Sequence, residues 1–379
     1  MDMPTVGVEE EFLLVEPRTG VPTARNEAVA RTARERGVDL QLELSRCEVE
    51  TSTDVHSSIA ELLDQVREQR WMVARCAEAN NARLLAVAVP PTVPESFPVT
   101  ATPRYLSIAE NFGMIAHEQG LCGCHVHVSV PDRETAVRVS DHLRPWLPTF
   151  LALTANSAIY RAADTGYASW RSILWRRWPS AGPPPHFGSA HAYDAMVRMM
   201  FTAGIILDEK MVYWDVRPSV SYPTVEVRVS DVPATVEETA LLAALVRATV
   251  HTARHALADG RTAPDVPAEM LRAAYWTAAR SGMDGDVVAP MDGRVLAARD
   301  LLGALLDTID SALTELGDRE FVAEAVDSVL ARGNGAARQR RAFGPEHDVA
   351  AVLAELAEAT TDSCTPPSES VTVTDEGTR

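Results

Sequence analysis

The sequence that decides the fold is residues 7–15, GVEEEFLLV, close to the N-terminus. The aromatic, β-branched and aliphatic residues that follow its acidic run predict a β-strand. Side chains alternate between the two faces of a strand, so Glu9 and Glu11 share one face and Glu10 lies on the other. Two carboxylates on one face repel each other and resist the loss of water unless a cation compensates them. The stretch therefore indicates either a metal site or a strand end with solvated acids.

Four more predicted strands carry acidic, histidine or arginine side chains on one face. A half-exposed sheet normally shows Lys, Thr, Gln and Ser on its solvent face. Taken singly, these residues are also explained by solvated acids, a hydrogen-bonded sheet histidine and cross-strand ion pairs. Their coincidence on five strands favours one polar basin. The pairs that share a face are Glu48 with Glu50, His125 with His127, Asp215 with Arg217, and Glu226 with Arg228.

Charge and cysteine content exclude several classes of function. The 379 residues carry a formal net charge of −18, so we expect neither nucleic acid nor an anionic membrane as a partner. The five cysteines are few and lack the spacing of a disulfide framework, which is typical of the reducing cytoplasm. No signal peptide and no apolar run of bilayer length are evident. We expect a cytoplasmic protein that acts on small molecules.

The order of patterns predicts an α+β fold with a sheet covered by helices on one face. Strand and helix patterns are mixed over about 230 residues, and the patterns that follow are helical. We expect one domain over 1–361 and a disordered tail over 362–379, which is rich in Ser, Thr, Pro and Glu. The helical C-terminal part is a candidate homodimer interface. The irregular segment 161–188 contains Trp and Pro and is a candidate lid.

The periodicity of apolar residues gives the expected elements. The predicted strands after the first are 42–53, 84–89, 122–130, 210–217 and 224–230. The predicted helices are 26–36, 57–83, 105–118, 132–143, one opened by Pro145, 189–202, 236–258, 267–280, 294–316, 319–331 and 345–359.

A basin of carboxylates suits hard cations such as Mg²⁺ or Mn²⁺, and histidine tolerates Mn²⁺. Neighbouring arginines would bind phosphate or carboxylate, which favours nucleoside triphosphate chemistry. The chain has no Gly-x-x-x-x-Gly-Lys-Ser/Thr loop, so phosphates are not held in the Walker manner. The basic segment 333–341 near a predicted helix start is either a phosphate contact or a solvated charge run.

Several of these segments together resemble the glutamate–cysteine ligase type 2 family of carboxylate–amine ligases. The resemblance covers about residues 4–360 and rests on the combination, since no single motif is specific. It implies a glutamine-synthetase-like catalytic domain with a curved, mainly antiparallel sheet, ATP and Mg²⁺ (or Mn²⁺) as cofactors, and glutamate–cysteine ligation, often a weak activity in such proteins. The segments are 7–12, 124–128, 179–184, 214–218, 226–231 and 335–340.

The resemblance also implies roles for individual residues. Arg228 and His125 are both expected to be catalytic. Arg228 is expected to bind the transferred phosphoryl group, and His125 to lie beside the metals. The alternative of Glu50 in place of Glu48 stays open. The expected metal ligands are Glu9, Glu11, Glu48, His125 and Glu226, and the expected ATP-binding arginines are Arg228, Arg338 and Arg340.

These expectations converge on ATP-dependent amide formation through an acyl phosphate, with a glutamate-like carboxylate and a cysteine-like amine as substrates. The rival is a metal-dependent amidohydrolase, because a His-x-His motif on a strand also supplies the first metal ligands in amidohydrolase barrels. That rival predicts further His and Asp residues at later strand ends and a repeating strand–helix order. A third interpretation is a non-catalytic protein that binds a nucleotide or a partner.

Overall fold

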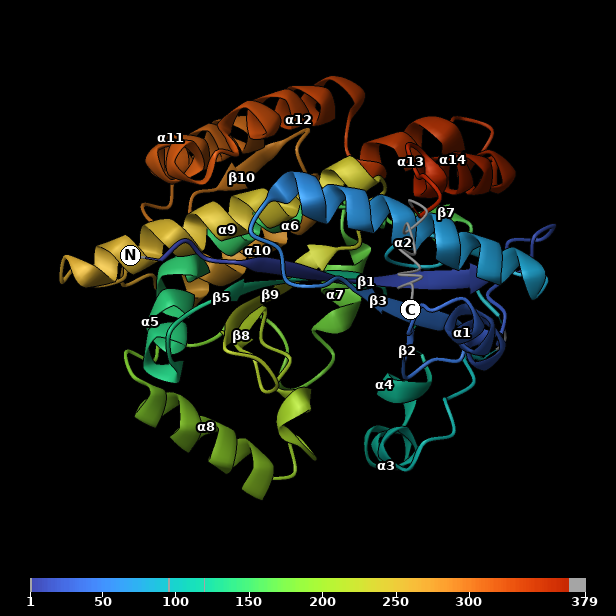
Figure 1. Ribbon diagram of the computed structural model, residues 1–379, viewed down its shortest axis with the longest axis horizontal. Helices are drawn as coiled ribbons and strands as arrows, with labels where there is room; N and C mark the ends of the chain where they lie inside the picture. Colours follow the sequence, from blue (N-terminus) through green and yellow to red (C-terminus); the bar gives the residue numbers. More distant parts are fainter. Residues whose placement is uncertain (1, 95, 119, 368–379) are drawn as a thin grey trace, which may run out of the picture.

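The computed structural model describes residues 2–94, 96–118 and 120–367, and its centre is an antiparallel sheet built around β1 (Figure 1). β1 lies between β3 and β5, and the order across the sheet is β2-β3-β1-β5-β9-β8, with β4 also paired to β1. The strands of this sheet are β1 (Val6–Val15), β2 (Gln41–Leu42), β3 (Glu48–Ser52), β4 (Arg83–Leu85), β5 (Gly123–Ser129), β8 (Val216–Pro218) and β9 (Thr224–Asp231).

Two different strands share one edge of β1. Residues 6–10 of β1 pair with β5, and residues 13–15 pair with β4. The other edge pairs with β3, which places Glu11 opposite Glu50 and Leu13 opposite Glu48. The registers therefore bring the acids of β1 and β3 and the histidines of β5 into adjacent rows on one face.

Helices cover the other face of the sheet, as Figure 1 shows for α2 and α9 above β1. The bounds are α1 (Asn26–Glu35), α2 (Ile59–Ala79), α3 (Pro103–Phe112), α4 (Met114–His117), α5 (Arg133–Leu143), α6 (Leu147–Thr154), α7 (Trp170–Trp175), α8 (Ala190–Thr202), α9 (Val236–Ala258), α10 (Ala268–Ser281), α11 (Ala298–Leu316), α12 (Arg319–Arg332), α13 (Gly335–Phe343) and α14 (Val349–Thr361). Two short 3₁₀ helices lie at Arg144–Trp146 and Glu209–Met211, and two small hairpins at β6 (Ile159–Tyr160) with β7 (Ala163–Asp164) and β10 (Asp286–Val288) with β11 (Val295–Ala297).

The covered face is largely apolar and contains a buried ion pair. Val8, Val126 and Val227 pack into a core that α2 and α9 complete. Glu10 projects into this core and forms two hydrogen bonds with Arg70 of α2, of 3.1 Å from Nε and 2.5 Å from an Nη. The Thr239 hydroxyl of α9 donates to the same carboxylate at 2.6 Å. The one acid of β1 on this face is thus neutralised within the chain.

The predicted α+β architecture is confirmed: the sheet is antiparallel, helices cover one face, and the C-terminal part is mostly helical. Some segments differ. The strand expected at 210–217 is mostly loop and begins at Val216, and the helix expected from residue 294 begins at Ala298 after the β10–β11 hairpin. The helix at 335–343 was not predicted. The division into one domain and a tail stays a prediction, and residues 368–379 of that tail lie outside the described residues.

Within the described residues, no helix combines the length and the apolar character that crossing a membrane requires.

Candidate active site

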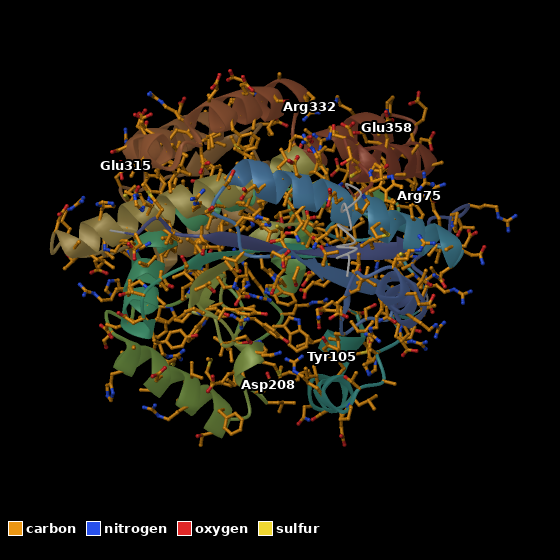
Figure 2. All side chains as sticks on the ribbon, in the orientation of Figure 1. Arg75, Tyr105, Asp208, Glu315, Arg332 and Glu358 are labelled. Atoms are coloured by element: carbon orange, nitrogen blue, oxygen red, sulfur yellow. The ribbon has the colours of Figure 1, made fainter. Side chains whose placement is uncertain are left out.

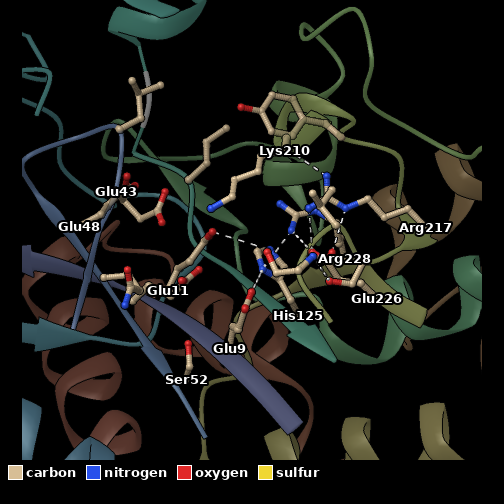
Figure 3. Close-up of a pocket in the computed structure, with 18 of the residues that line it drawn as sticks. Glu9, Glu11, Glu43, Glu48, Ser52, His125, Lys210, Arg217, Glu226 and Arg228 are labelled. Atoms are coloured by element: carbon tan, nitrogen blue, oxygen red, sulfur yellow. Dashed lines mark hydrogen bonds and ion pairs between the residues drawn. The ribbon is translucent and has the colours of Figure 1, made fainter. Parts of the chain in front are cut away.

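The open face of the sheet forms the floor of a pocket of about 360 Å³. Strands β1, β3, β5, β8 and β9 supply the floor, and α3, α7 and the segments around them supply the walls. Figure 3 shows the polar side chains of these strands pointing toward one another. The charged and histidine residues among the lining are Glu9, Glu11, Glu43, Glu48, Glu50, Glu226, Arg104, Lys210, Arg217, Arg228, His125 and His127.

Glu9 lies at the centre of this floor, between two histidines of β5. One oxygen is 3.0 Å from Nδ1 of His125 and the other is 3.4 Å from Nε2 of His127. Burial acts to raise the pKa of Glu9, but the hydrogen bonds from both histidines hold it well below its usual range. At His127, burial lowers the pKa by less than the carboxylates of Glu9 and Glu226 raise it. Glu9 is therefore an ionised carboxylate.

His125 links Glu9 to Glu11. Its Nε2 lies 3.7 Å from Glu11, and no described residue forms a hydrogen bond with this buried nitrogen. Burial and the charge of Arg228 lower the pKa of His125, so the ring is neutral. The second oxygen of Glu11 accepts from the backbone N–H of Gly123. A neutral imidazole and a fixed carboxylate thus face the same space.

An arginine-rich side of the pocket is formed by β8 and β9. Arg217 donates two hydrogen bonds to Glu226, of 2.9 and 3.1 Å, and Arg228 contacts the same carboxylate. Although burial opposes ionisation, the two guanidinium groups hold the pKa of Glu226 well below its usual range. Arg228 also lies 3.3 Å from Nδ1 of His125. Two arginines share one glutamate here, which leaves net positive charge facing the pocket.

The opposite side of the pocket holds acids without a comparable cation. Burial, followed by repulsion from Glu11 and Glu43, raises the pKa of Glu48 well above its usual range. Burial and repulsion from neighbouring acids do the same for Glu50, and they raise the pKa of the half-buried Glu43 to about 8. Figure 3 shows Glu43 and Glu48 on one side of His125 and Arg217 and Arg228 on the other. The pocket is therefore polarised.

The walls combine fixed aromatic residues with further cations. The Tyr105 hydroxyl donates to the carbonyl of Leu42 at 2.9 Å, and Arg104 binds Asp208 at 2.7 Å. Trp178 is buried and packs against Trp175. Both tryptophans belong to the segment 161–188, so that segment contributes fixed walls; its predicted closure as a lid stays a prediction. The lining also includes Lys210, whose amine points into the pocket in Figure 3.

The structure brings five of the predicted site residues together with Arg228, and it places two elsewhere. Arg338 forms a buried ion pair with Glu238 of α9 at 2.7 Å, and Arg340 pairs with Asp164 at 3.1 Å. Neither is among the described residues that line the pocket. Their predicted contact with ATP has no support in this geometry. The residues brought together are Glu9, Glu11, Glu48, His125 and Glu226.

The expected pairing of Asp215 with Arg217 was wrong. β8 begins at Val216, so Asp215 lies outside the strand and does not follow its alternation. Arg217 binds Glu226, whereas Asp215 is buried near Arg176. Burial raises the pKa of Asp215 to about 6.

Sequence reasoning missed Glu43, Arg104, Tyr105, Lys210 and Tyr213, all of which line the pocket. A signal existed for Glu43, because Leu42 and Leu44 alternate with it inside the predicted strand 42–53. Arg104 and Tyr105 belong to α3, and Lys210 and Tyr213 precede β8, so the position of these four residues depends on tertiary packing.

The donor set fits a divalent metal ion. One ligand atom each from Glu9, His125 and Glu226 lies within 4.8 Å of the others, and the same holds for Glu11, Glu50 and His125. Carboxylate oxygens with one imidazole nitrogen suit Mg²⁺ or Mn²⁺. Nε2 of His125 has no hydrogen-bond partner among the described residues, and burial with repulsion between acids raises the pKa values of Glu48 and Glu50, so a cation at this place would stabilise their ionised forms.

Comparisons with known proteins agree on one family. The family model described as glutamate–cysteine ligase family 2 matches residues 5–359. A Nocardia farcinica protein named "Putative glutamate--cysteine ligase 2-1" is 75% identical over 97% of this chain and 96% of its own length. A Mycobacterium sp. (strain KMS) protein named "Putative glutamate--cysteine ligase 2-2" is 59% identical over 94% and 98%.

A solved structure shares the fold. The glutamate–cysteine ligase of Francisella tularensis, crystallised in complex with AMP, superposes with a TM-score of 0.70 at 13% identity, covering 96% of this chain and 90% of that one. At this identity the likeness concerns the fold.

Proposed function

The chain belongs to glutamate–cysteine ligase family 2, and from this membership we propose that it joins the γ-carboxylate of a glutamate-like substrate to the amine of a cysteine-like one, at the expense of ATP. The predicted family resemblance and the predicted ligase of glutamate–cysteine type are confirmed. The nature of the two substrates, the metal and the residue roles below are proposals. So are the predicted cytoplasmic location and the homodimer.

The observation that carries the proposal is the polarised pocket. Burial of several acids without a cation within the chain costs free energy, which a bound divalent ion would recover. Arginines on the other side of His125 would bind the phosphates that such an ion accompanies. A metal bound to carboxylates and shared with substrate phosphates is the usual mode of Mg²⁺ in ATP-dependent enzymes.

We assign the metal to Glu9, Glu11 and His125, with Glu48 or Glu50 as a further ligand; Glu50 has a ligand atom within 4.8 Å of those of Glu11 and His125. When bound, Mg²⁺ would neutralise triphosphate charge and polarise the phosphoryl oxygens. Glu226 also lies within reach of Glu9 and His125. However, two arginines already neutralise Glu226, so its clearer role is to fix the direction of Arg228.

The reaction needs activation of a carboxylate, because its oxygen is a poor leaving group. The substrate carboxylate attacks the γ-phosphorus of ATP, ADP departs and an acyl phosphate forms. Arg228 stabilises the negative charge that develops on the phosphoryl oxygens. The amine then attacks the acyl carbon, and phosphate leaves with one oxygen from the original carboxylate. Trp175 and Trp178 limit water near the acyl phosphate.

The amidohydrolase alternative gains no support. It requires parallel strands that alternate with helices, and every strand pair of the sheet that carries His125 and His127 is antiparallel.

Isotope transfer tests the proposal directly. Glutamate labelled with ¹⁸O in the γ-carboxylate is incubated with cysteine, ATP and Mg²⁺, and the phosphate released is analysed by mass spectrometry. We expect amino-acid-dependent ADP release and one ¹⁸O atom in each phosphate. Glu9→Gln should abolish both while the protein stays folded. Phosphate without label would overturn the acyl-phosphate route, and absence of ADP release with every carboxylate tested would overturn the proposed function.

A further inference from the structure

A second group of metal-ligand side chains lies on the helical side of the molecule, away from the pocket. His251 and His255 are one helical turn apart on α9, and Glu315 is in the last turn of α11. Figure 2 shows Glu315 on the side of the sheet opposite Tyr105, which lines the pocket. His251 is 15 residues along α9 from its start, which corresponds to about 22 Å of helix.

Three donor atoms of this group converge on one point. Nε2 of His251 lies 3.2 Å from Nε2 of His255 and 3.0 Å from Oε2 of Glu315, and the third separation, from His255 to Glu315, is 3.9 Å. Zn²⁺ binds nitrogen and oxygen at about 2.0–2.2 Å, so ligands of a tetrahedral ion lie roughly 3.3–3.6 Å apart. Two histidines at positions i and i+4 of a helix are a recurrent half of such sites.

The packing of α9 against α11 fixes the group before any ion binds. The His251 side chain is 2% exposed, whereas those of His255 and Glu315 are 44% and 45% exposed. The hydroxyl of Ser311, one turn before Glu315, donates to its other oxygen at 3.2 Å. The buried histidine cannot turn away, and the two exposed ligands leave a route from solvent to the converging atoms.

The two ring nitrogens of His251 differ in their contacts, because Nε2 faces His255 and Glu315. Nδ1 of His251 is buried without a hydrogen-bond partner among the described residues, so the ring owes its orientation to packing and to the Nε2 contacts.

We propose that His251, His255 and Glu315 form a binding site for a Zn²⁺-like transition-metal ion, with water as the fourth ligand, which ties α9 to α11. The site is separate from the carboxylate pocket and from the ligase reaction. Its two imidazoles favour Zn²⁺ or Co²⁺, whereas the acids of the pocket favour Mg²⁺. The competing explanation is a salt bridge with a neighbouring histidine and no affinity for metal.

Visible absorption of Co²⁺ distinguishes these explanations, because four-coordinate Co²⁺ absorbs strongly and Co²⁺ in six oxygen ligands absorbs weakly. The metal-free full-length protein is titrated with Co²⁺ in excess Mg²⁺ and then with Zn²⁺. The variants are His255→Ala and Glu315→Gln, which alter exposed side chains, and the matched control is His191→Ala on α8.

We expect one equivalent of Co²⁺ to give the intense spectrum in the wild type and in His191→Ala, and Zn²⁺ to displace it. His255→Ala and Glu315→Gln should bind Co²⁺ at least about tenfold more weakly. Turnover with Mg²⁺ should be the same in all four proteins, since none of these residues lines the pocket. A weak six-coordinate spectrum in the wild type, or the same intense spectrum in both site variants, would overturn the proposal.

Discussion

Glu10 and Glu48 lie on opposite faces of one sheet and on neighbouring strands, and both are almost fully buried, at 2% and 4% exposed. Glu10 receives two hydrogen bonds from Arg70 and one from Thr239. Glu48 is contacted by the Cys122 thiol at 3.8 Å and by the backbone of Leu121, neither of which is charged. The same residue type is thus part of the core on one face and lines the pocket on the other.

The difference between these two glutamates indicates which buried charges have a functional role. A carboxylate whose charge the chain itself compensates contributes to the fold, and removing its partner costs stability. A buried carboxylate that has no positively charged neighbour in the chain either stays protonated or binds a cation. Glu43, Glu48 and Glu50 are of the second kind, and this supports the assignment of the open face to a metal and ATP.

Breaking the ion pair between Glu10 and Arg70 should have the largest effect, and that effect should be on stability. Arg70→Met leaves Glu10 buried without a cation, and we expect the free energy of unfolding to fall by about 3–5 kcal/mol. Urea unfolding monitored by circular dichroism measures this. The double variant Glu10→Gln with Arg70→Met should recover part of the loss. If Arg70→Met were nearly neutral, the contrast between the faces would not hold.

Removing an uncompensated acid should affect activity and spare the fold. Glu48→Gln keeps the shape of the side chain and removes charge repulsion, so the free energy of unfolding without divalent ions should stay equal or rise. Turnover with Mg²⁺ and ATP should fall about 10- to 100-fold, as for loss of a metal contact. Steady-state kinetics and urea unfolding on the same preparation give both values. Full activity in Glu48→Gln would exclude Glu48 as a ligand.

The pH dependence of stability should reveal the raised pKa of Glu43. Its pKa is about 8 in the folded protein against an ordinary value of 4.5, so between these pH values the folded state holds a proton that the unfolded state has lost. The stabilisation is complete below about pH 4.5 and disappears as pH rises through about 8. From pH 5 to 8 the wild type should lose stability relative to Glu43→Gln, by up to about 1 kcal/mol per pH unit. Thermal unfolding of the two metal-free proteins across this range measures the difference, and parallel curves would contradict it.

The smallest effect is expected at Arg340, which was predicted to bind ATP. Its ion pair with Asp164 is partly exposed, and such pairs contribute about 0–1 kcal/mol. Arg340→Ala should change neither stability beyond that amount nor the KM for ATP. A large rise in this KM would restore the predicted role and show that the pocket described here is incomplete.

The alternation rule explains why much of the site could be predicted. Glu9, Glu48, His125 and Glu226 lie inside strands, so period two assigns each to the correct face, although the pairing of β5 with β9 shifts in register between Cys124 and Val126. The rule fails at Asp215, which precedes its strand.

Longer-range placement could not be read from the sequence. Arg104 and Lys210 come from segments outside the sheet, and only packing brings them to the pocket. Arg338, whose contact with ATP stays a prediction, is paired with an acid in the structure, although a basic run after Gly333 is compatible with phosphate binding. Its partner Glu238 lies about 100 residues away on α9, and no local pattern reveals that pair.

Binding of Mn²⁺ tests the central claim most directly, because free Mn²⁺ is counted by electron paramagnetic resonance. The measurement compares Glu315→Gln, which removes the second metal group, with the same protein carrying Glu48→Gln, both with and without ATP. We predict tight binding in the first protein, strengthened by ATP, and at least about tenfold weaker binding in the second. Equal binding in the two proteins would contradict the assignment of the uncompensated acids to a metal site.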